Sequence, residues 1–260
     1  MKNAIIQYYL DFNGVGKQEK HYSNGGVPEW ARYSVGAFKK YAEHNGADHH
    51  FYQDRFVNAE SNFFECLRVY LDPSLDKYDK VLYCDVDVMP KEIKSNVFQI
   101  DVKDVAGVPE YPHPEYAVPV NWNRSGPLQS RFEHFGARLE PSVSTKAPFR
   151  MINSGVVLWS REARLKAREL FIDHEEWFHY KNAWLDRSLK GVGHSSHCLD
   201  QPFLNAMWSK HNFDVEELGK VWNRFPTKNE NDYCVFAHYV QDYRFKIPEL
   251  FKDKVTPWNE

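Results

Sequence analysis

One short apolar run that ends in two acids constrains the fold of this chain more than any other feature. Residues 80–88 read Lys-Val-Leu-Tyr-Cys-Asp-Val-Asp-Val. A nearly continuous apolar run of this length is typical of a strand that is covered on both faces, as in sheets flanked by helices. Asp85 and Asp87 interrupt the run only at its far end, where burying an unpaired charge would be costly. The two acids therefore need a positively charged partner.

The rest of the chain alternates between extended and helical patterns. Upstream of the acids, we expect a strand in residues 1–10, a helix from Pro28 to Asn45, a strand from Asp48 to Tyr52 and a helix after residue 62. Downstream, we expect a strand at 151–159, a helix at 163–171, a helix that opens at Asp200 and a strand at 234–237. This alternation predicts an α/β fold with helices on both faces of a sheet.

The predicted helix after residue 62 carries a start signal. Asn62 is followed three residues later by Glu65, the spacing of a capping box. The apolar residues that follow mark an inward face, and Arg68 lies off that face.

Composition narrows the class of protein. A chain of 260 residues, 42% of them hydrophobic, can bury one sizeable core, so we expect a single domain over 1–260. The formal net charge of -3 gives no overall field that would attract nucleic acid or an anionic membrane surface. No stretch approaches 18 apolar residues, and the run at 4–6 is too short for a signal peptide. We therefore expect a soluble, cytoplasmic protein without a transmembrane segment, of unknown oligomeric state.

The two acids predict a divalent cation. Residues two apart on a strand project to the same face, so Asp85 and Asp87 are expected to lie side by side. Carboxylate oxygens suit Mg²⁺ or Mn²⁺, and diphosphate oxygens can fill the remaining coordination positions. In open α/β sheets, ligands also bind beyond the carboxyl ends of the strands, where this pair is expected. A salt-bridged or turn-capping pair of acids is the alternative without a ligand.

A phosphatase shares part of this pattern. An apolar strand that ends in Asp-x-Asp-x-Val also resembles the nucleophile strand of haloacid-dehalogenase-like phosphatases, in which the first acid becomes phosphorylated. Such enzymes place that strand first and end a later strand in a pair of acids. This chain has a predicted strand upstream, and its last apolar strand ends in His238.

Four blocks of sequence follow one another along the chain: residues 68–90, which end in the two acids, Ile-Asn-Ser-Gly-Val-Val-Leu at 152–158, Asp-Gln-Pro-Phe-Leu-Asn at 200–205 and Phe-Ala-His-Tyr at 236–239. In this order and approximate spacing they resemble the motifs of glycosyltransferase family 8. The resemblance implies a GT-A fold, which is Rossmann-like, with a mixed, mostly parallel central sheet flanked by helices.

The resemblance also divides the single domain into parts. A nucleotide-binding half is expected at 1–108 and a sugar and acceptor half at 151–260. Between them, the segment from Pro109 to Phe149 is rich in proline and aromatic residues and has no sustained period, so 109–150 is expected to be an ordered excursion that serves as a lid or acceptor platform.

The resemblance implies a role for each matching residue. A cation, Mn²⁺ or Mg²⁺, is expected to be bound by Asp85, Asp87 and His238. Asp200 is expected to accept sugar hydroxyls beside the anomeric carbon, and Gln201 to present its carbonyl to the developing oxocarbenium face, as the catalytic residues. The residues expected to bind the donor are Tyr8, Tyr9, Arg68, Asp85, Val86, Asn153, Ser154, Gly155 and Arg244.

Physical reasons support several of these donor contacts. Arg68 offers a planar fork for sugar hydroxyls or phosphate oxygens, and is otherwise an exposed helix residue. Gly155 leaves room for a close approach. Arg244 replaces the family's usual lysine and keeps a positive charge for the diphosphate, whereas Gln241 replaces a glycine. The two tyrosines of the first strand stand where the family usually has an acid, and one of them is expected to stack on uracil.

The sequence thus predicts a metal-dependent transferase that moves a sugar from a UDP-sugar to a hydroxyl of a glycan or other acceptor, with retention of the anomeric configuration. Inversion stays open, because Glu110 or Glu115 in the excursion could serve as a base. Two further functions stay open as well: a phosphatase and a non-catalytic binder of nucleotide sugars.

Overall fold

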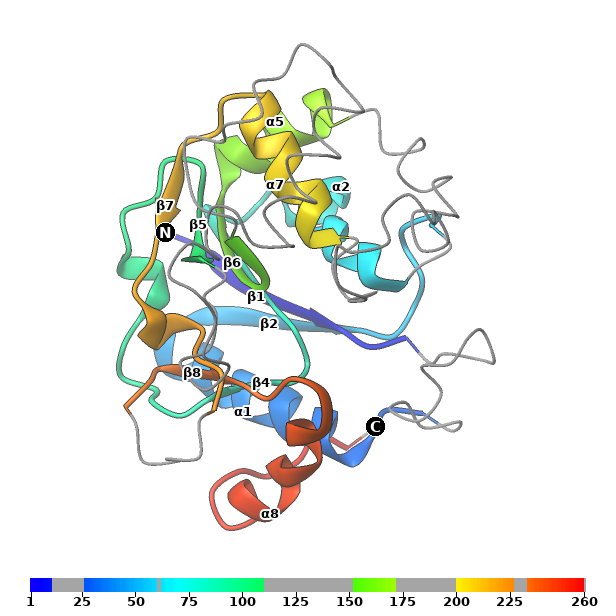
Figure 1. The fold of residues 1–260 in the computed structure, drawn as a ribbon, viewed down its shortest axis with the longest axis vertical. Helices are drawn as coiled ribbons and strands as arrows, with labels where there is room; N and C mark the ends of the chain where they lie inside the picture. The colour runs from blue at the N-terminus through cyan, green and yellow to red at the C-terminus, as the bar shows by residue number, and fades with distance from the viewer. Residues whose placement is uncertain (11–25, 60–61, 110–151, 172–199, 227–232, 260) are drawn as a thin grey trace, which may run out of the picture.

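A six-stranded sheet in the order β2-β1-β3-β6-β5-β7 forms the centre of the protein (Figure 1). The computed structural model of the chain describes residues 1–10, 26–59, 62–109, 152–171, 200–226 and 233–259. The strands of the sheet are β1 (Asn3–Tyr8), β2 (Ala47–Tyr52), β3 (Lys80–Cys84), β5 (Val105–Pro109), β6 (Ile152–Ser160) and β7 (Val215–Glu217). The pairings β1–β2, β1–β3 and β5–β7 are parallel, while β6 is antiparallel to both of its neighbours. The sheet is mixed and mostly parallel, as predicted.

Alternate residues of the central strands pack into two cores on opposite faces of the sheet. Val81 and Tyr83 of β3 join one core with residues of α2, α5 and α7, whereas Leu82 and Cys84 join the other core with residues of α1. Figure 1 shows these helices above and below the sheet. The helices are α1 (Glu29–Asn45), α2 (Arg68–Leu71), α5 (Arg161–Leu170), α7 (Asp200–Lys210) and α8 (Ile247–Phe251). The prediction of helices on both faces is confirmed.

Helix α1 begins and ends where the sequence predicts. Pro28 stands at its N-cap, and Gly46 follows its last turn with a φ of 65°. In this left-handed conformation, which glycine adopts without a steric penalty, the Gly46 N–H donates to the carbonyls of Ala42 and Glu43.

The stretch after residue 61 differs from its prediction. It forms a 3-10 helix at Asn62–Leu67 that continues into the short helix α2. Glu65 does not close a capping box; its carboxylate accepts hydrogen bonds from the backbone N–H groups of Phe56 and Val57. Arg68 is buried rather than exposed. A 3-10 helix has three residues per turn, so the inward face inferred from α-helical spacing does not apply here.

The chain leaves the sheet directly before the two acids. β3 ends at Cys84, and the Asp85 N–H donates to the carbonyl of Gly155 on β6 at 2.9 Å. The Val88 N–H then donates to the carbonyl of Asp85 at 3.2 Å and closes a turn. The predicted strand at 80–88 is therefore wrong in its second half. A turn, and not one face of a strand, brings the two acids together.

A second, two-stranded sheet follows this turn. β4 (Val88–Pro90) pairs antiparallel with β8 (Phe236–His238), and Val88 lies opposite His238. This pairing carries a C-terminal residue to the end of β3, and it ends at His238 as the sequence predicts for the last apolar strand.

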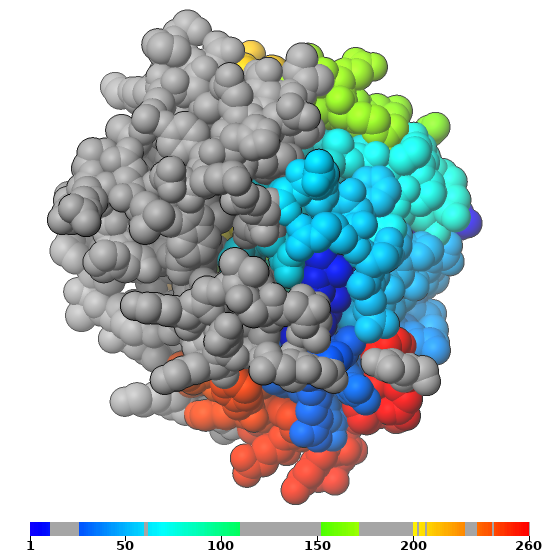
Figure 2. All heavy atoms as spheres, turned by 90° about the vertical axis from the view of Figure 1, so that its right-hand side faces the viewer, coloured from blue at the N-terminus to red at the C-terminus, as the bar shows by residue number. Residues whose placement is uncertain are grey.

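The C-terminal segment packs against α1. Ile247 and Phe251 of α8 share a core with Trp30, Ala31 and Tyr33 of α1. Figure 2 shows the C-terminal residues, in orange and red, along the lower edge of this face beside the blue residues of α1. Short 3-10 helices at 73–75, 97–99, 220–222 and 241–246 complete the described elements.

Two expectations concern other parts of the chain. The excursion at 109–150 lies outside the described residues, apart from its first residue. Within the described ranges, no helix combines the length and apolar character that crossing a membrane requires.

Candidate metal and donor site

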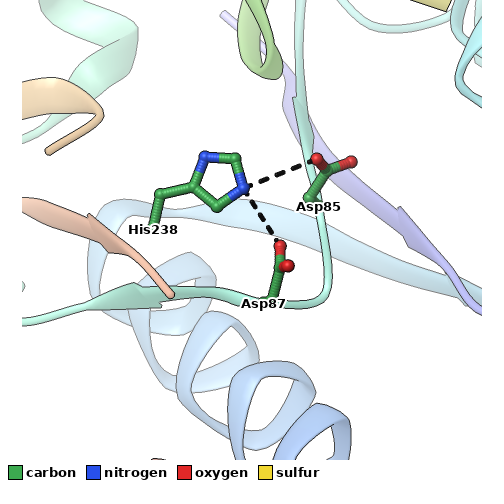
Figure 3. A group of neighbouring side chains, drawn as sticks. All are labelled: Asp85, Asp87 and His238. Atoms are coloured by element: carbon green, nitrogen blue, oxygen red, sulfur yellow. Dashed lines mark ion pairs between the residues drawn. The ribbon is translucent and has the colours of Figure 1, made fainter. Parts of the chain in front are cut away.

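Asp85, Asp87 and His238 form one cluster, as the sequence predicts. One potential ligand atom from each of these residues lies within 4.8 Å of the others. Figure 3 shows the imidazole facing both acids: Nε2 of His238 is 3.1 Å from Oδ1 of Asp87 and 3.7 Å from Oδ2 of Asp85. The acids come from the turn after β3, and the imidazole comes from the end of β8.

The donor set of this cluster fits a divalent cation such as Mn²⁺. Two carboxylates supply hard oxygen ligands and the imidazole supplies a borderline nitrogen, a mixture that Mn²⁺ accepts. The side chains of Asp87 and His238 are 11% and 5% exposed, whereas that of Asp85 is 36% exposed. The cluster is therefore closed on one side and open on the side of Asp85, where a further ligand can approach.

Gly155 of β6 makes this cluster sterically possible. A Cβ atom at this position would lie 2.4 Å from Cε1 of His238 and 2.8 Å from Oδ2 of Asp85. Both distances are too short for any side chain. The sequence predicts this glycine for a close approach; in the structure, the side chains of His238 and Asp85 make it.

The charges around the two acids differ. Burial raises the pKa of Asp85, and the negative charge of Asp87 raises it further. Burial also acts to raise the pKa of Asp87, but the positive charges of Arg244 and His238 outweigh it, so this pKa lies below its usual value. Nη2 of Arg244 is 3.0 Å from Oδ2 of Asp87. Arg244 thus lies next to the cluster, and its contact with a diphosphate stays a prediction.

Three side chains that the sequence did not indicate hold the acid-bearing turn. The Tyr83 hydroxyl donates to Oδ1 of Asp85 at 2.5 Å, which leaves Oδ2 directed at His238. Gln7 donates to the backbone carbonyl of Asp85 at 3.3 Å, and Ser34 donates to that of Val88 at 2.6 Å. Gln7 also donates to Ser34 at 3.0 Å, so strand β1 and helix α1 together fix both ends of the turn.

The predicted catalytic residues lie at the first turn of α7, against the start of β6. Asp200 is buried, and burial together with the negative charge of Asp85 raises its pKa to about 7. The Cys66 thiol donates to Oδ2 of Asp200 at 3.8 Å. Oε1 of Gln201 accepts from Nδ2 of Asn153 at 3.3 Å and from the N–H of Ser154 at 3.2 Å.

A sequence comparison decides which family this site belongs to. The model of glycosyl transferase family 8 matches residues 61–246, which is most of the chain and includes the acid pair, the start of α7 and His238. The chain belongs to glycosyltransferase family 8. It is therefore a glycosyltransferase, and the phosphatase hypothesis is wrong. None of the curated proteins compared matches the chain.

Solved structures of glycosyltransferases share the fold of this family 8 enzyme. It is similar to a glycosyltransferase involved in the glycosylation of the major capsid of PBCV-1, with 13% identity, a TM-score of 0.52 and coverage of 96% of this chain and 98% of that chain. It is also similar to the galactosyltransferase LgtC in complex with donor and acceptor sugar analogs, with 14% identity, a TM-score of 0.51 and coverage of 99% and 98%. These likenesses establish the GT-A fold.

The remaining predicted donor residues of the family 8 enzyme lie in three places. Asn153, Ser154 and Gly155 lie at the start of β6, between the cluster and Gln201. Val86 is half-buried between the two acids. Tyr8 is half-buried and stacks on Tyr83 with 6.0 Å between ring centroids, whereas Tyr9 is only 5% exposed and packs edge-on against Trp30. Of the two tyrosines, Tyr8 is thus the more exposed residue.

Arg68 makes its ion pairs with acids outside the cluster of Asp85, Asp87 and His238. Its Nε lies 3.2 Å from Asp72 and its Nη1 lies 3.2 Å from Asp54. The guanidinium also stacks over the ring of Tyr52, at 3.5 Å from the centroid, and over that of Phe56 at 4.7 Å. The hypothesis of an exposed helix residue is wrong, and the contact of Arg68 with a donor stays a prediction.

Proposed function

We propose that this protein transfers a sugar from a UDP-sugar to a hydroxyl of a glycan acceptor, in a metal-dependent reaction that retains the anomeric configuration. The observation that carries the proposal is the cluster of two carboxylates and one imidazole at the carboxyl end of β3, open on the side of Asp85. The carboxyl ends of strands are where α/β folds bind nucleotides.

In this proposal, Asp85, Asp87 and His238 hold Mn²⁺, with Mg²⁺ as the alternative ion. When bound, the cation neutralises charge on the diphosphate leaving group. Arg244, whose guanidinium is 3.0 Å from Asp87, adds a second positive charge beside the same phosphates. Arg68, Val86 and the two tyrosines of β1 complete the proposed donor contacts.

The sugar is proposed to lie between the cluster and the first turn of α7. Asp200 and Asn153 have the polar groups to bind sugar hydroxyls, and Gln201 has a carbonyl for the developing positive charge at the anomeric carbon. Gly155 and Ser154 line the strand that connects these groups to the metal. In this proposal, the departing diphosphate helps to deprotonate the incoming hydroxyl, so no strong protein base is needed. The hydroxyl must then approach the face of the sugar that the diphosphate leaves, and the configuration is retained.

We also propose that 1–260 acts as one domain, with a nucleotide-binding half at 1–108 and a sugar and acceptor half at 151–260. Support comes from the sheet order, since β6 lies between β3 and β5. Strands of the two proposed halves therefore share hydrogen bonds along their length, and neither half closes a sheet alone.

Calorimetric titration of UDP into the Asp87→Asn variant tests the metal assignment. We expect wild-type protein to bind UDP only with Mn²⁺, and the variant to lose at least about tenfold in affinity, because an amide is a weaker ligand than a carboxylate. Asp253→Asn, at an exposed position near the C-terminus, is the charge-matched control. If Asp87→Asn binds UDP like the wild type, the metal assignment is wrong.

A thermal-shift panel of nucleotide sugars with and without Mn²⁺ then identifies the donor, since a ligand that binds only the folded state raises its unfolding temperature. Slow hydrolysis of that donor would show that it is a substrate as well as a ligand. NMR of the anomeric linkage in the product distinguishes retention from inversion.

A further inference from the structure

A chain of buried amide side chains connects the proposed metal ligand His238 to the proposed catalytic residue Gln201. Nδ1 of His238 is 3.1 Å from Oδ1 of Asn223. Nδ2 of Asn223 is 2.8 Å from Oδ1 of Asn153, and Nδ2 of Asn153 is 3.3 Å from Oε1 of Gln201. All four side chains are buried. Asn223 is the one member of this chain that no motif of the sequence indicates.

Two backbone N–H groups determine the direction of every hydrogen bond in this chain. The Gly155 N–H faces Asn153 at 3.0 Å, and a backbone N–H can only donate, so the facing atom of Asn153 is its oxygen. That same oxygen receives the amino group of Asn223. At the other end, the Ser154 N–H faces Gln201 at 3.2 Å, so the facing atom there is also an oxygen, which the Asn153 amino group can reach. The two backbone contacts thus agree on which amide atom is oxygen and which is nitrogen in Asn153, and the contact with Asn153 then decides the same for Asn223.

This orientation leaves one possibility for the imidazole. The amino group of Asn223 is directed at Asn153, so its oxygen faces Nδ1 of His238. An amide oxygen only accepts, and therefore Nδ1 must carry the hydrogen. Nε2, the atom that faces Asp85 and Asp87, is then the nitrogen that a cation can bind in place of the Nε2 proton.

We propose that Asn223 is a positioning residue, which holds His238 in the tautomer and ring orientation that a metal ligand needs. Other contacts fix the plane of the ring, because Phe225 stacks on it at 5.1 Å between centroids and Gly155 leaves space at Cε1. The contact with Asn223 holds a hydrogen on Nδ1 and so leaves Nε2 as the nitrogen available to a cation. The inference rests on the proposed metal site and extends it to a residue outside the proposed ligands.

Two variants of Asn223 are expected to differ in their effect on His238. Asn223→Ala removes the acceptor for the Nδ1 hydrogen, so this hydrogen is no longer held on Nδ1. Asn223→Asp keeps an acceptor for that hydrogen but loses the amino group that donates to Asn153. The Asp variant is thus predicted to preserve the metal ligand and the Ala variant to damage it. Loss of a residue that orients a metal ligand typically lowers metal affinity by about 10- to 100-fold.

Titration of Mn²⁺ into the full-length protein, followed by the EPR signal of the free ion, tests this assignment. We expect affinity to fall at least about tenfold in Asn223→Ala and to stay within about threefold of wild type in Asn223→Asp. Asn45→Ala is the control. That asparagine donates to the carbonyls of Tyr41 at 2.8 Å and Ile93 at 3.1 Å, so its loss removes comparable hydrogen bonds outside the cluster.

Thermal unfolding in EDTA separates positioning from a general structural role. If Asn223 only stabilised the fold, all three variants would unfold at lower temperature while their Mn²⁺ affinities stayed equal to that of wild type. That result, or equal losses of affinity in Asn223→Ala and Asn223→Asp, overturns the inference and leaves the metal site intact. Absence of Mn²⁺ binding by the wild-type protein would instead overturn the proposed function together with the inference. If Asn223→Ala does not fold, a loss of affinity in the Asp variant alone is sufficient to reject it.

Discussion

Replacing Gly155 by alanine tests the geometry of the metal cluster directly, because the new atom would stand between two proposed ligands. Its Cβ would lie 2.4 Å from Cε1 of His238 and 2.8 Å from Oδ2 of Asp85. Carbon atoms in contact prefer about 3.5 Å or more, so the ring would have to retreat by about 1 Å. Ligand distances in a metal site tolerate about 0.2 Å. We therefore expect at least one ligand to be lost.

The expected effect is large for metal binding and moderate for folding. Mn²⁺ affinity should fall by about 100-fold or more, equivalent to about 2.7 kcal/mol, whereas overpacking typically costs stability about 1–3 kcal/mol. EPR titration measures the first quantity, and urea unfolding in EDTA measures the second. Gly219→Ala is the matched control, because nothing lies within 4 Å of its added Cβ. An affinity in Gly155→Ala within threefold of this control would refute the reasoning.

Two further predictions concern side chains beside the cluster. The raised pKa of Asp200 means that the folded state binds its proton more tightly than the unfolded state, so this stabilisation is present below pH 3.8 and is lost as the pH rises to about 7. Without metal, Asp200→Asn should therefore gain up to about 4 kcal/mol relative to wild type between pH 4 and pH 8, measured by urea unfolding; parallel pH profiles would contradict this. Tyr83→Phe removes the hydrogen bond to Asp85 and should weaken Mn²⁺ binding about tenfold in the same EPR titration, since a bond to a charged group is worth about 1.5–3 kcal/mol. Tyr41→Phe, which loses hydrogen bonds to Ser95 and Val97, is its control and should bind Mn²⁺ like the wild type.

The helices and strands that could be predicted have a long or uninterrupted hydrophobic pattern, or clear signals at their ends. β6 is buried at all nine positions, and α1 has a proline before it and a glycine after it, so each has clear limits. β5 and β7 were missed for the opposite reason. β5 contains a glycine and ends in a proline, and β7 has one apolar residue followed by two acids. Hydrogen bonds with neighbouring strands, which a local pattern does not encode, make these segments extended.

The grouping of Asp85, Asp87 and His238 could be predicted because these residue types are unusual for their surroundings. Two acids after an apolar run and a histidine after another are conspicuous, because charged or polar groups rarely end such runs without a partner. The geometric reason was nevertheless wrong, since the acids lie on a turn. Gln7, Ser34 and Asn223 were missed because a single polar residue has no period or spacing, and its role depends on which atoms the fold brings within about 3 Å of it. The burial of Arg68 could not be predicted either, because the sequence did not indicate the 3-10 helix before it.

The pairing of β4 with β8 also determines when the site can form during protein synthesis. A ribosome makes Asp85 and Asp87 in the first half of the chain, whereas His238 and the strand opposite β4 emerge much later. Until then, a nascent chain has two neighbouring acids, no imidazole to complete them and an open strand edge. Binding of the proposed cation is thus expected to coincide with the last folding steps, and added manganese should not complete the site in a chain that stalls before β8.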